Sequence, residues 1–160
     1  MKTLILVRHG KSSWEHDVRD SERPLKKRAY KDAEKVINAL REKYDEQPIL
    51  WSSPAVRALE SARIFQKELG IPENDFFIKG ELYTFDDRQL LRSIISCDDS
   101  VDHLMVFGHN PAITEVVNSL GNEVFYNVPT TGLAFIEFDS TSWKNLGKGK
   151  TLFHLFPKNL

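Results

Sequence analysis

The sequence has little cysteine and no long apolar run. Cys97 is the single cysteine among 160 residues, and both a disulfide framework and a cysteine-based zinc cluster need several thiols, so both are excluded. A reducing cytoplasm is the simplest compartment. The apolar start of the chain reaches only to Arg8, far short of a signal peptide or a membrane span. We therefore expect a cytoplasmic protein without a membrane partner.

Net charge is also nearly absent. The chain carries 22 Lys and Arg against 23 Asp and Glu, a net charge of −1. That balance excludes the globally basic surface that non-specific nucleic-acid binding uses, so we expect no nucleic-acid partner and only local recognition of phosphate. No repeat, low-complexity tract or linker rich in Gly, Ser or Pro divides the chain, and its length suits one domain. We expect a single domain over residues 1–160.

Strand and helix patterns alternate along the chain. Short apolar runs predict buried strands at residues 3–7, 48–51, 76–79 and 102–107, and three- and four-residue spacing predicts helices at residues 25–44, 54–69, 86–96 and 112–120. Residues 132–138 and 150–156 are two strand patterns with no helix between them, which is typical of an antiparallel pair. The sequence therefore predicts an α/β protein, a three-layer αβα sandwich with a mostly parallel central sheet and an antiparallel C-terminal pair.

Polar residues follow three of the predicted strands. Arg8 and His9 end the first, His109 follows the fourth, and after the second strand Ser53 is placed to cap a helix that carries Arg57 in its first turns. Ligands of open α/β sheets bind outside the carboxyl ends of the strands, where helix N-termini attract anions. We therefore expect these arginines and histidines to surround one site, although Arg8-His9-Gly10 alone would fit an ordinary strand end.

Two arginines and two histidines suit phosphoryl chemistry. The guanidinium group binds phosphoryl oxygens bidentately and stays charged, and a neutral imidazole nitrogen is a competent nucleophile near neutral pH. The remaining histidines have no partner at metal-ligand spacing, so we expect no metal ion. These residue types favour phosphoryl transfer through a phosphohistidine.

Six short motifs resemble one known family. They are Leu6-Val7-Arg8-His9-Gly10-Lys11-Ser12, Arg23-Pro24-Leu25, Ser52-Ser53-Pro54-Ala55-Val56-Arg57-Ala58, Glu81-Leu82-Tyr83, Gly108-His109-Asn110-Pro111 and Pro129-Thr130-Thr131-Gly132. Their order and their spread over nearly the whole chain resemble the histidine phosphatase superfamily, also called phosphoglycerate-mutase-like. The short chain, with no insertion before His109 large enough for a helical lid, looks like the small bacterial branch of SixA-type phosphohistidine phosphatases.

The resemblance implies a role for each matching residue. His9 would be the nucleophile that takes the phosphoryl group, Arg8 and Arg57 would clamp its oxygens, and His109 would complete the pocket as a further donor. Arg23 matches an arginine at the pocket mouth of the short branch. The implied fold is phosphoglycerate-mutase-like, and no cofactor is expected.

Three further residues are candidates for substrate binding. Ser12 would add a hydroxyl group to the pocket, or else cap its own loop. Gly108 belongs to the motif around His109 and would line the same site. Glu81 lies where larger relatives carry an acidic general acid, yet a lone glutamate there could equally be a surface residue.

The resemblance leaves several functions open. One is a hydrolase in signal transduction that acts on a phosphohistidine-containing protein, such as a phosphotransfer domain, through a covalent intermediate on His9. A second is a phosphomonoesterase for small phosphorylated molecules. A third is a phosphate-binding module without turnover, which the intact His9 and His109 disfavour because anion binding alone needs no nucleophile.

Overall fold

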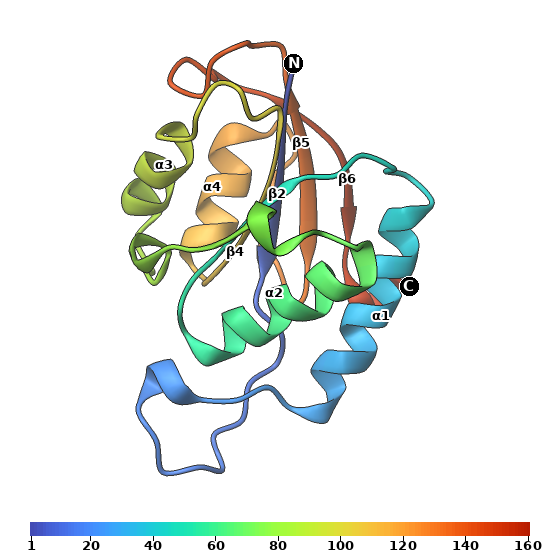
Figure 1. The fold of residues 1–160 in the computed structure, drawn as a ribbon, viewed down its shortest axis with the longest axis vertical. Helices are drawn as coiled ribbons and strands as arrows, with labels where there is room; N and C mark the ends of the chain where they lie inside the picture. Colours follow the sequence, from blue (N-terminus) through green and yellow to red (C-terminus); the bar gives the residue numbers. More distant parts are fainter.

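The computed structural model describes residues 1–160 and contains one six-stranded sheet in the order β3-β2-β4-β1-β5-β6 (Figure 1). The strands are β1 (Lys2–Arg8), β2 (Ile49–Ser52), β3 (Phe76–Ile78), β4 (His103–Gly108), β5 (Leu133–Phe138) and β6 (Lys150–Leu155). Strand β4 pairs in parallel with β1 and β2, and β2 pairs in parallel with β3. Strand β5 is antiparallel to both β1 and β6. The expected mostly parallel sheet with an antiparallel pair at the C-terminus is confirmed.

Helices cover both faces of the sheet (Figure 1). They are α1 (Lys27–Arg41), α2 (Val56–Leu69), α3 (Asp87–Ile95) and α4 (Ala112–Leu120). Side chains of a strand alternate between its faces. On β1, Ile5 and Val7 share a core with α1 and α2, whereas Leu4 and Leu6 share the other core with α3 and α4. These two cores confirm the three-layer αβα sandwich.

The start of α2 corrects one prediction. We expected Ser53 to cap a helix beginning at Pro54, but α2 begins at Val56, Ala55 precedes it, and no side chain caps it. The Ser53 hydroxyl instead accepts a hydrogen bond from the Ala55 amide at 3.2 Å and lies 2.8 Å from Nε2 of His109. The Ser53 hydroxyl thus contacts a histidine in the turn after β4 instead of capping the helix.

The sheet order brings the expected site together. Strands β2, β4 and β1 are neighbours, so the turns after them meet at one end of the sheet. The His9 amide donates to the Gly108 carbonyl at 3.1 Å, and the Ser53 amide donates to the Phe107 carbonyl at 3.1 Å. Backbone hydrogen bonds thus hold the three turns side by side.

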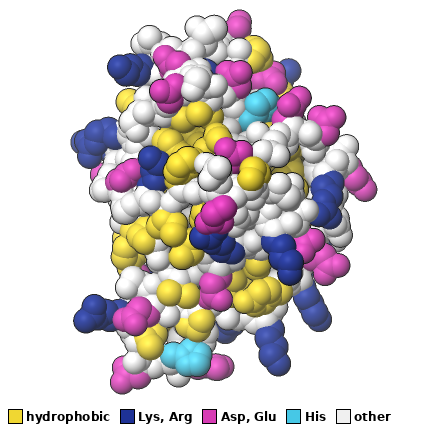
Figure 2. All heavy atoms as spheres, in the orientation of Figure 1, with side chains coloured by type: hydrophobic (Ala, Val, Ile, Leu, Met, Phe, Trp, Pro, Cys, Tyr) yellow, Lys and Arg dark blue, Asp and Glu magenta, His cyan; other side chains and the backbone are white.

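The surface matches the balanced composition. On the face shown in Figure 2, basic and acidic side chains are interspersed, with apolar side chains between them. None of the helices has the length and apolar character needed to cross a membrane.

Candidate active site

His9 directly follows β1 and is 7% exposed. Its Nδ1 lies 2.7 Å from the Gly10 carbonyl oxygen. A carbonyl only accepts, so the ring proton is on Nδ1 and Nε2 carries a lone pair, which accepts a hydrogen bond from Nε of Arg57. Burial lowers the pKa of His9 to about 4; the Gly10 hydrogen bond opposes the shift, and the positive charges of Arg57, Arg8 and Arg23 add to it. His9 is therefore neutral at pH 7, with an unprotonated Nε2.

Arg57 lies directly in front of that nitrogen. It is the second residue of α2, is 2% exposed, and its Nε is 3.3 Å from Nε2 of His9. Its other two nitrogens donate to Asp20, one to the backbone carbonyl at 2.7 Å and one to the carboxylate at 3.0 Å. The guanidinium charge and the positive end of α2 thus face the same point.

Arg8 and Thr131 form the wall on the β5 side. Nη1 of Arg8 donates to the Val128 carbonyl at 3.1 Å, and burial lowers the pKa of Arg8. The Thr131 amide donates to the carbonyl oxygens of Arg8 and His9 at 3.0 and 3.1 Å. Thr131 has a φ of 61°, a conformation unusual for a β-branched residue. This turn fixes the backbone from which Arg8 and His9 project.

His109 follows β4, is 1% exposed, and has its ring centroid 5.2 Å from that of His9. Nε2 of His109 is the acceptor within reach of the Ser53 hydroxyl proton, since the other contact of that hydroxyl is the hydrogen bond it accepts from Ala55; with this donation the imidazole proton lies on Nδ1. Burial, followed by the charges of His9 and Arg57, lowers the pKa of His109 to about 3. His109 is thus a neutral ring that offers an N–H.

Three buried polar atoms in the protein have no hydrogen-bond partner: Nε of Arg8, Nδ1 of His109 and Oγ1 of Thr131. All three residues belong to the turns around His9. Unsatisfied buried polar groups are rare because each costs about 1–3 kcal/mol. An oxyanion bound here would provide several acceptors to unpaired donors.

Arg23 reaches the edge of the same cluster. Its Nη1 donates to the Ser12 hydroxyl at 2.8 Å, its Nε lies 3.2 Å from the Asp20 carboxylate, and its guanidinium carbon is 3.5 Å from the centre of the Trp14 ring. Ser12 also forms a β-bridge with Leu25. In this arrangement the observed contact of Ser12 is with Arg23 and not with His9.

The remaining two candidates, Gly108 and Glu81, differ in their position relative to His9. The carbonyl of Gly108 accepts from His9, and a Cβ at this position would lie 3.3 Å from the Ile113 side chain, so the glycine permits tight packing beside the site. Glu81 is exposed and lines a groove with residues of α3, among them Gln89 and Arg92. The structure does not bring Glu81 to His9.

Sequence reasoning missed Asp20 and Tyr83. Tyr83 packs its ring 5.2 Å from the ring of His109 and donates its hydroxyl proton to the Asp20 carboxylate at 2.5 Å. Partial burial would raise the pKa of Asp20, but hydrogen bonds from Tyr83, Arg57 and Arg23 lower it to about 2. The spacing of Asp20 three residues before Arg23 was the one available signal, because Tyr83 is 63 positions away.

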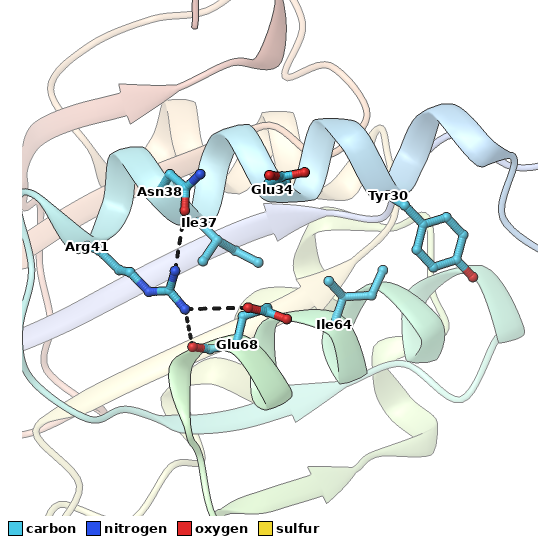
Figure 3. A pocket seen from close by; sticks show the side chains of 7 residues that line it. All are labelled: Tyr30, Glu34, Ile37, Asn38, Arg41, Ile64 and Glu68. Atoms are coloured by element: carbon cyan, nitrogen blue, oxygen red, sulfur yellow. Dashed lines mark hydrogen bonds and ion pairs between the residues drawn. The ribbon is translucent and has the colours of Figure 1, made fainter.

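A hollow between α1 and α2 has a different character from the His9 site (Figure 3). Ile37 and Ile64 supply its apolar side chains, and Arg41 closes one end by contacts with Asn38 and Glu68. None of the residues around His9 lines it. The convergence of arginines and histidines is therefore confined to the carboxyl end of the sheet.

Known proteins match both the sequence and the fold. Residues 4–75 match the family model of the histidine phosphatase superfamily, branch 1. An uncharacterized chloroplastic protein of Arabidopsis thaliana is 28% identical over 152 residues, which cover 89% of this chain and 69% of the relative.

Solved structures share the whole fold. The protein histidine phosphatase SixA, solved in complex with tungstate, has a TM-score of 0.82 at 21% identity, with 98% of each chain covered. Phosphoserine phosphatase of Entamoeba histolytica, in complex with 3-phosphoglyceric acid, has a TM-score of 0.67 at 16% identity, with 96% of each chain covered. Both likenesses, at 21% and 16% identity, concern the fold. Residues 4–75 thus resemble the histidine phosphatase superfamily, and the whole chain shares the fold of these two phosphatases.

Proposed function

We propose that residues 1–160 act as one histidine phosphatase domain that hydrolyses phosphohistidine on a partner protein, without a metal ion or other cofactor. In the first step Nε2 of His9 attacks phosphorus, and the bond to the substrate imidazole breaks with its electron pair going to that nitrogen; with a proton on its other ring nitrogen, the substrate leaves as neutral imidazole. Arg8, Arg57 and the Nδ1 proton of His109 stabilise the phosphoryl oxygens, and Arg23 binds at the rim. The oxygen of a water molecule then attacks the phosphorus of phospho-His9, the P–N bond pair returns to Nε2, and inorganic phosphate leaves carrying the two protons of that water.

One observation carries the choice of substrate: no protonated carboxyl group lies beside His9. Asp20 is the carboxyl group in contact with the cluster, and in the resting protein hydrogen bonds from Tyr83, Arg57 and Arg23 lower its pKa to about 2, so it meets the substrate as a carboxylate. An alkoxide leaving group needs a positioned acid, whose help is worth about a hundred- to ten-thousandfold. Imidazole, whose conjugate acid has a pKa of about 6.5, leaves with less assistance. The geometry therefore favours phosphohistidine over phosphate monoesters.

Comparative kinetics test this proposal. The protein is incubated with a phosphohistidine-containing phosphotransfer domain, phosphoramidate, phosphoserine and a sugar phosphate, and the values of kcat/KM are compared. We expect the phosphohistidine protein to be turned over fastest, and Glu81→Gln to leave that rate unchanged. Faster turnover of phosphoserine or the sugar phosphate would instead identify a small-molecule phosphomonoesterase.

Trapping the intermediate tests the nucleophile. After brief reaction with a labelled phosphodonor, the protein should carry label that is lost in acid and kept in alkali, as a phosphoramidate bond behaves. His9→Ala removes the attacking nitrogen and should carry no label. Acid-stable label on the unmodified protein would identify another nucleophile.

A further inference from the structure

The connection from β1 to α1 carries an exposed tip above the site. Its base is fixed by the β-bridge between Ser12 and Leu25 and by a 2.8 Å hydrogen bond from the Ser13 amide to the Pro24 carbonyl. Residues 14–22, which we call the tip, are nearly all exposed. In Figure 1 this blue segment extends beyond the carboxyl ends of the strands. The tip therefore has a firm base and little packing of its own.

Asp20 alone fastens the tip to other elements by hydrogen bonds. Arg57 donates to its backbone carbonyl at 2.7 Å and to its carboxylate at 3.0 Å. Tyr83 donates to the same carboxylate at 2.5 Å. At the base of the loop, Arg23 adds an ion pair at 3.2 Å. One carboxylate thus joins the tip, α2 and the turn before α3.

Those contacts use the donors that a phosphoryl group needs. A carboxylate and a phosphoryl group offer oxygen acceptors of the same charge sign to the same guanidinium fork. Nε of Arg57 donates to the nucleophilic nitrogen of His9 at 3.3 Å, so the two terminal nitrogens that Asp20 holds belong to the guanidinium group beside that nitrogen. A phosphoryl group that takes the same N–H groups must displace the Asp20 carboxylate, and beside each other the two anions repel.

We propose that Asp20 is an internal competitor for the oxyanion site, which holds Arg57 and Arg23 in the resting protein and must leave them when a phosphoryl group binds. The inference rests on the proposed function in taking Arg57 as a ligand of phosphoryl oxygens. Asp20 then lowers the affinity for every oxyanion by the fraction of time it occupies the site. The product, inorganic phosphate, is released faster because the carboxylate returns to the arginines.

Charge supports this competition. The hydrogen bonds from Tyr83 and Arg57 hold the pKa of Asp20 near 2, so the carboxylate is an anion throughout the physiological range. The guanidinium groups of Arg57 and Arg23 remain charged as well. The exchange is therefore between two anions for one cationic site.

Oxyanion binding to matched variants tests the inference. The affinities for tungstate and for inorganic phosphate are measured by titration calorimetry on the unmodified protein, Asp20→Asn, Asp20→Ala and Asp17→Asn. Asp17 is exposed in the same tip and makes no ion pair or hydrogen bond, so its variant removes the same charge without freeing an arginine. We expect about tenfold tighter binding in both Asp20 variants and less than a twofold change in Asp17→Asn. Unchanged or weaker binding in the Asp20 variants would overturn the inference.

A second measurement uses the unmodified protein. Trp14 is 76% exposed and stacks on Arg23, whereas the buried Trp143 donates its indole N–H to the Val101 carbonyl at 2.7 Å. As tungstate saturates the site, we expect the Trp14 indole proton signal to shift, with that of Trp143 as the fixed reference. A Trp14 signal that stays in place at saturation would contradict the displacement of the tip.

The two proposals can fail separately. Tungstate and inorganic phosphate need no turnover, so tighter binding to the Asp20 variants establishes the competition even if phosphohistidine is not the preferred substrate. Conversely, the protein could hydrolyse phosphohistidine while its Asp20 variants bind both anions with unchanged affinity. That result would support the proposed function and overturn the role of Asp20 as a competitor.

Discussion

The two site histidines are both neutral, yet they present opposite hydrogen-bonding faces. The Gly10 carbonyl accepts from Nδ1 of His9, which leaves an acceptor on Nε2. The Ser53 hydroxyl donates to Nε2 of His109, which leaves a donor on Nδ1. A nucleophile needs the first state and a group that stabilises phosphoryl oxygens needs the second. Two neighbouring hydrogen bonds thus assign different tasks to chemically identical rings.

Ser53 should therefore act as a positioning residue. We expect Ser53→Ala to lower kcat for phosphohistidine about tenfold to a hundredfold, because His109 loses the bond that fixes its tautomer, worth about 1–3 kcal/mol when a buried partner is left unpaired. Ser53→Thr keeps the hydroxyl and should restore most of the rate. Ser52→Ala is the control, because the neighbouring hydroxyl bonds only a backbone carbonyl. Equal losses in Ser53→Ala and Ser52→Ala would reduce Ser53 to a packing role.

Loss of the Arg57 side chain should lower kcat more than loss of the Ser53 hydroxyl. Removing a preorganised donor of this kind costs about a hundred- to a thousandfold in rate, and we expect that loss of kcat in Arg57→Ala. Arg63→Ala removes another arginine of α2, one that pairs with Glu73 at the surface, and should change kcat less than twofold. Steady-state kinetics of both variants check the prediction. A similar rate in the two would mean that the guanidinium in front of His9 does not touch the reacting group.

The sequence could predict some site residues and not others, for a physical reason. Arg8, His9, Arg57 and His109 each follow a recognisable strand, so topology alone placed them together. The catalytic roles proposed for these four residues stay predictions. Asp20 meets Tyr83 only because a loop folds over the sheet, and no local pattern encodes that contact.

At the scale of elements, capping residues in the sequence predicted helix ends correctly where no tertiary contact competed with them. Pro111 and Gly121 flank α4, which has the predicted bounds 112–120. Gly70, with a φ of 68°, ends α2 as predicted. The predicted start of α2 at Pro54 was wrong, because Ser53 contacts His109 in the turn after β4 and does not cap the helix. Tertiary contacts thus override local patterns where an element enters the site.

Gly10 decides how closely α1 approaches the end of β1. A Cβ at this position would lie 2.8 Å from the Cβ of Ala29 in α1 and 3.1 Å from the Leu25 side chain. We expect Gly10→Ala to lower the free energy of unfolding by about 1–3 kcal/mol, the cost of overpacking a well-filled interior. Activity should fall too, because the Gly10 carbonyl holds His9. Gly80→Ala is the control, since a Cβ there would have no neighbour within 4 Å. Urea unfolding of the two variants checks this, and equal stabilities would contradict the close fit.

At the scale of the whole molecule, the site is built from segments far apart in the sequence. Strands β2, β4 and β1 are parallel neighbours and share one hydrophobic core with α2. This packing brings residue 9 close to residues 57 and 109. The site therefore exists only in the folded chain, where burial keeps both histidines uncharged. In the unfolded chain they recover an ordinary pKa of about 6.5. Folding and protonation are thus linked.

That link predicts how stability depends on pH. His9 and His109 have folded pKa values of about 4 and 3. Below pH 6.5 the unfolded chain binds protons that the folded protein does not, so the stability conferred by neutral histidines is complete above pH 6.5 and is lost as pH falls towards 4. Each site contributes a slope of about 1.4 kcal/mol per pH unit within this window. Urea unfolding between pH 7 and pH 4.5 should therefore show the free energy of unfolding falling with pH, with a smaller slope in His9→Asn or His109→Asn. The same slope in these variants and in the unmodified protein would mean that burial does not hold the two rings neutral. His9 would then be protonated, and would lose its nucleophilic lone pair, in the acidic half of this pH range.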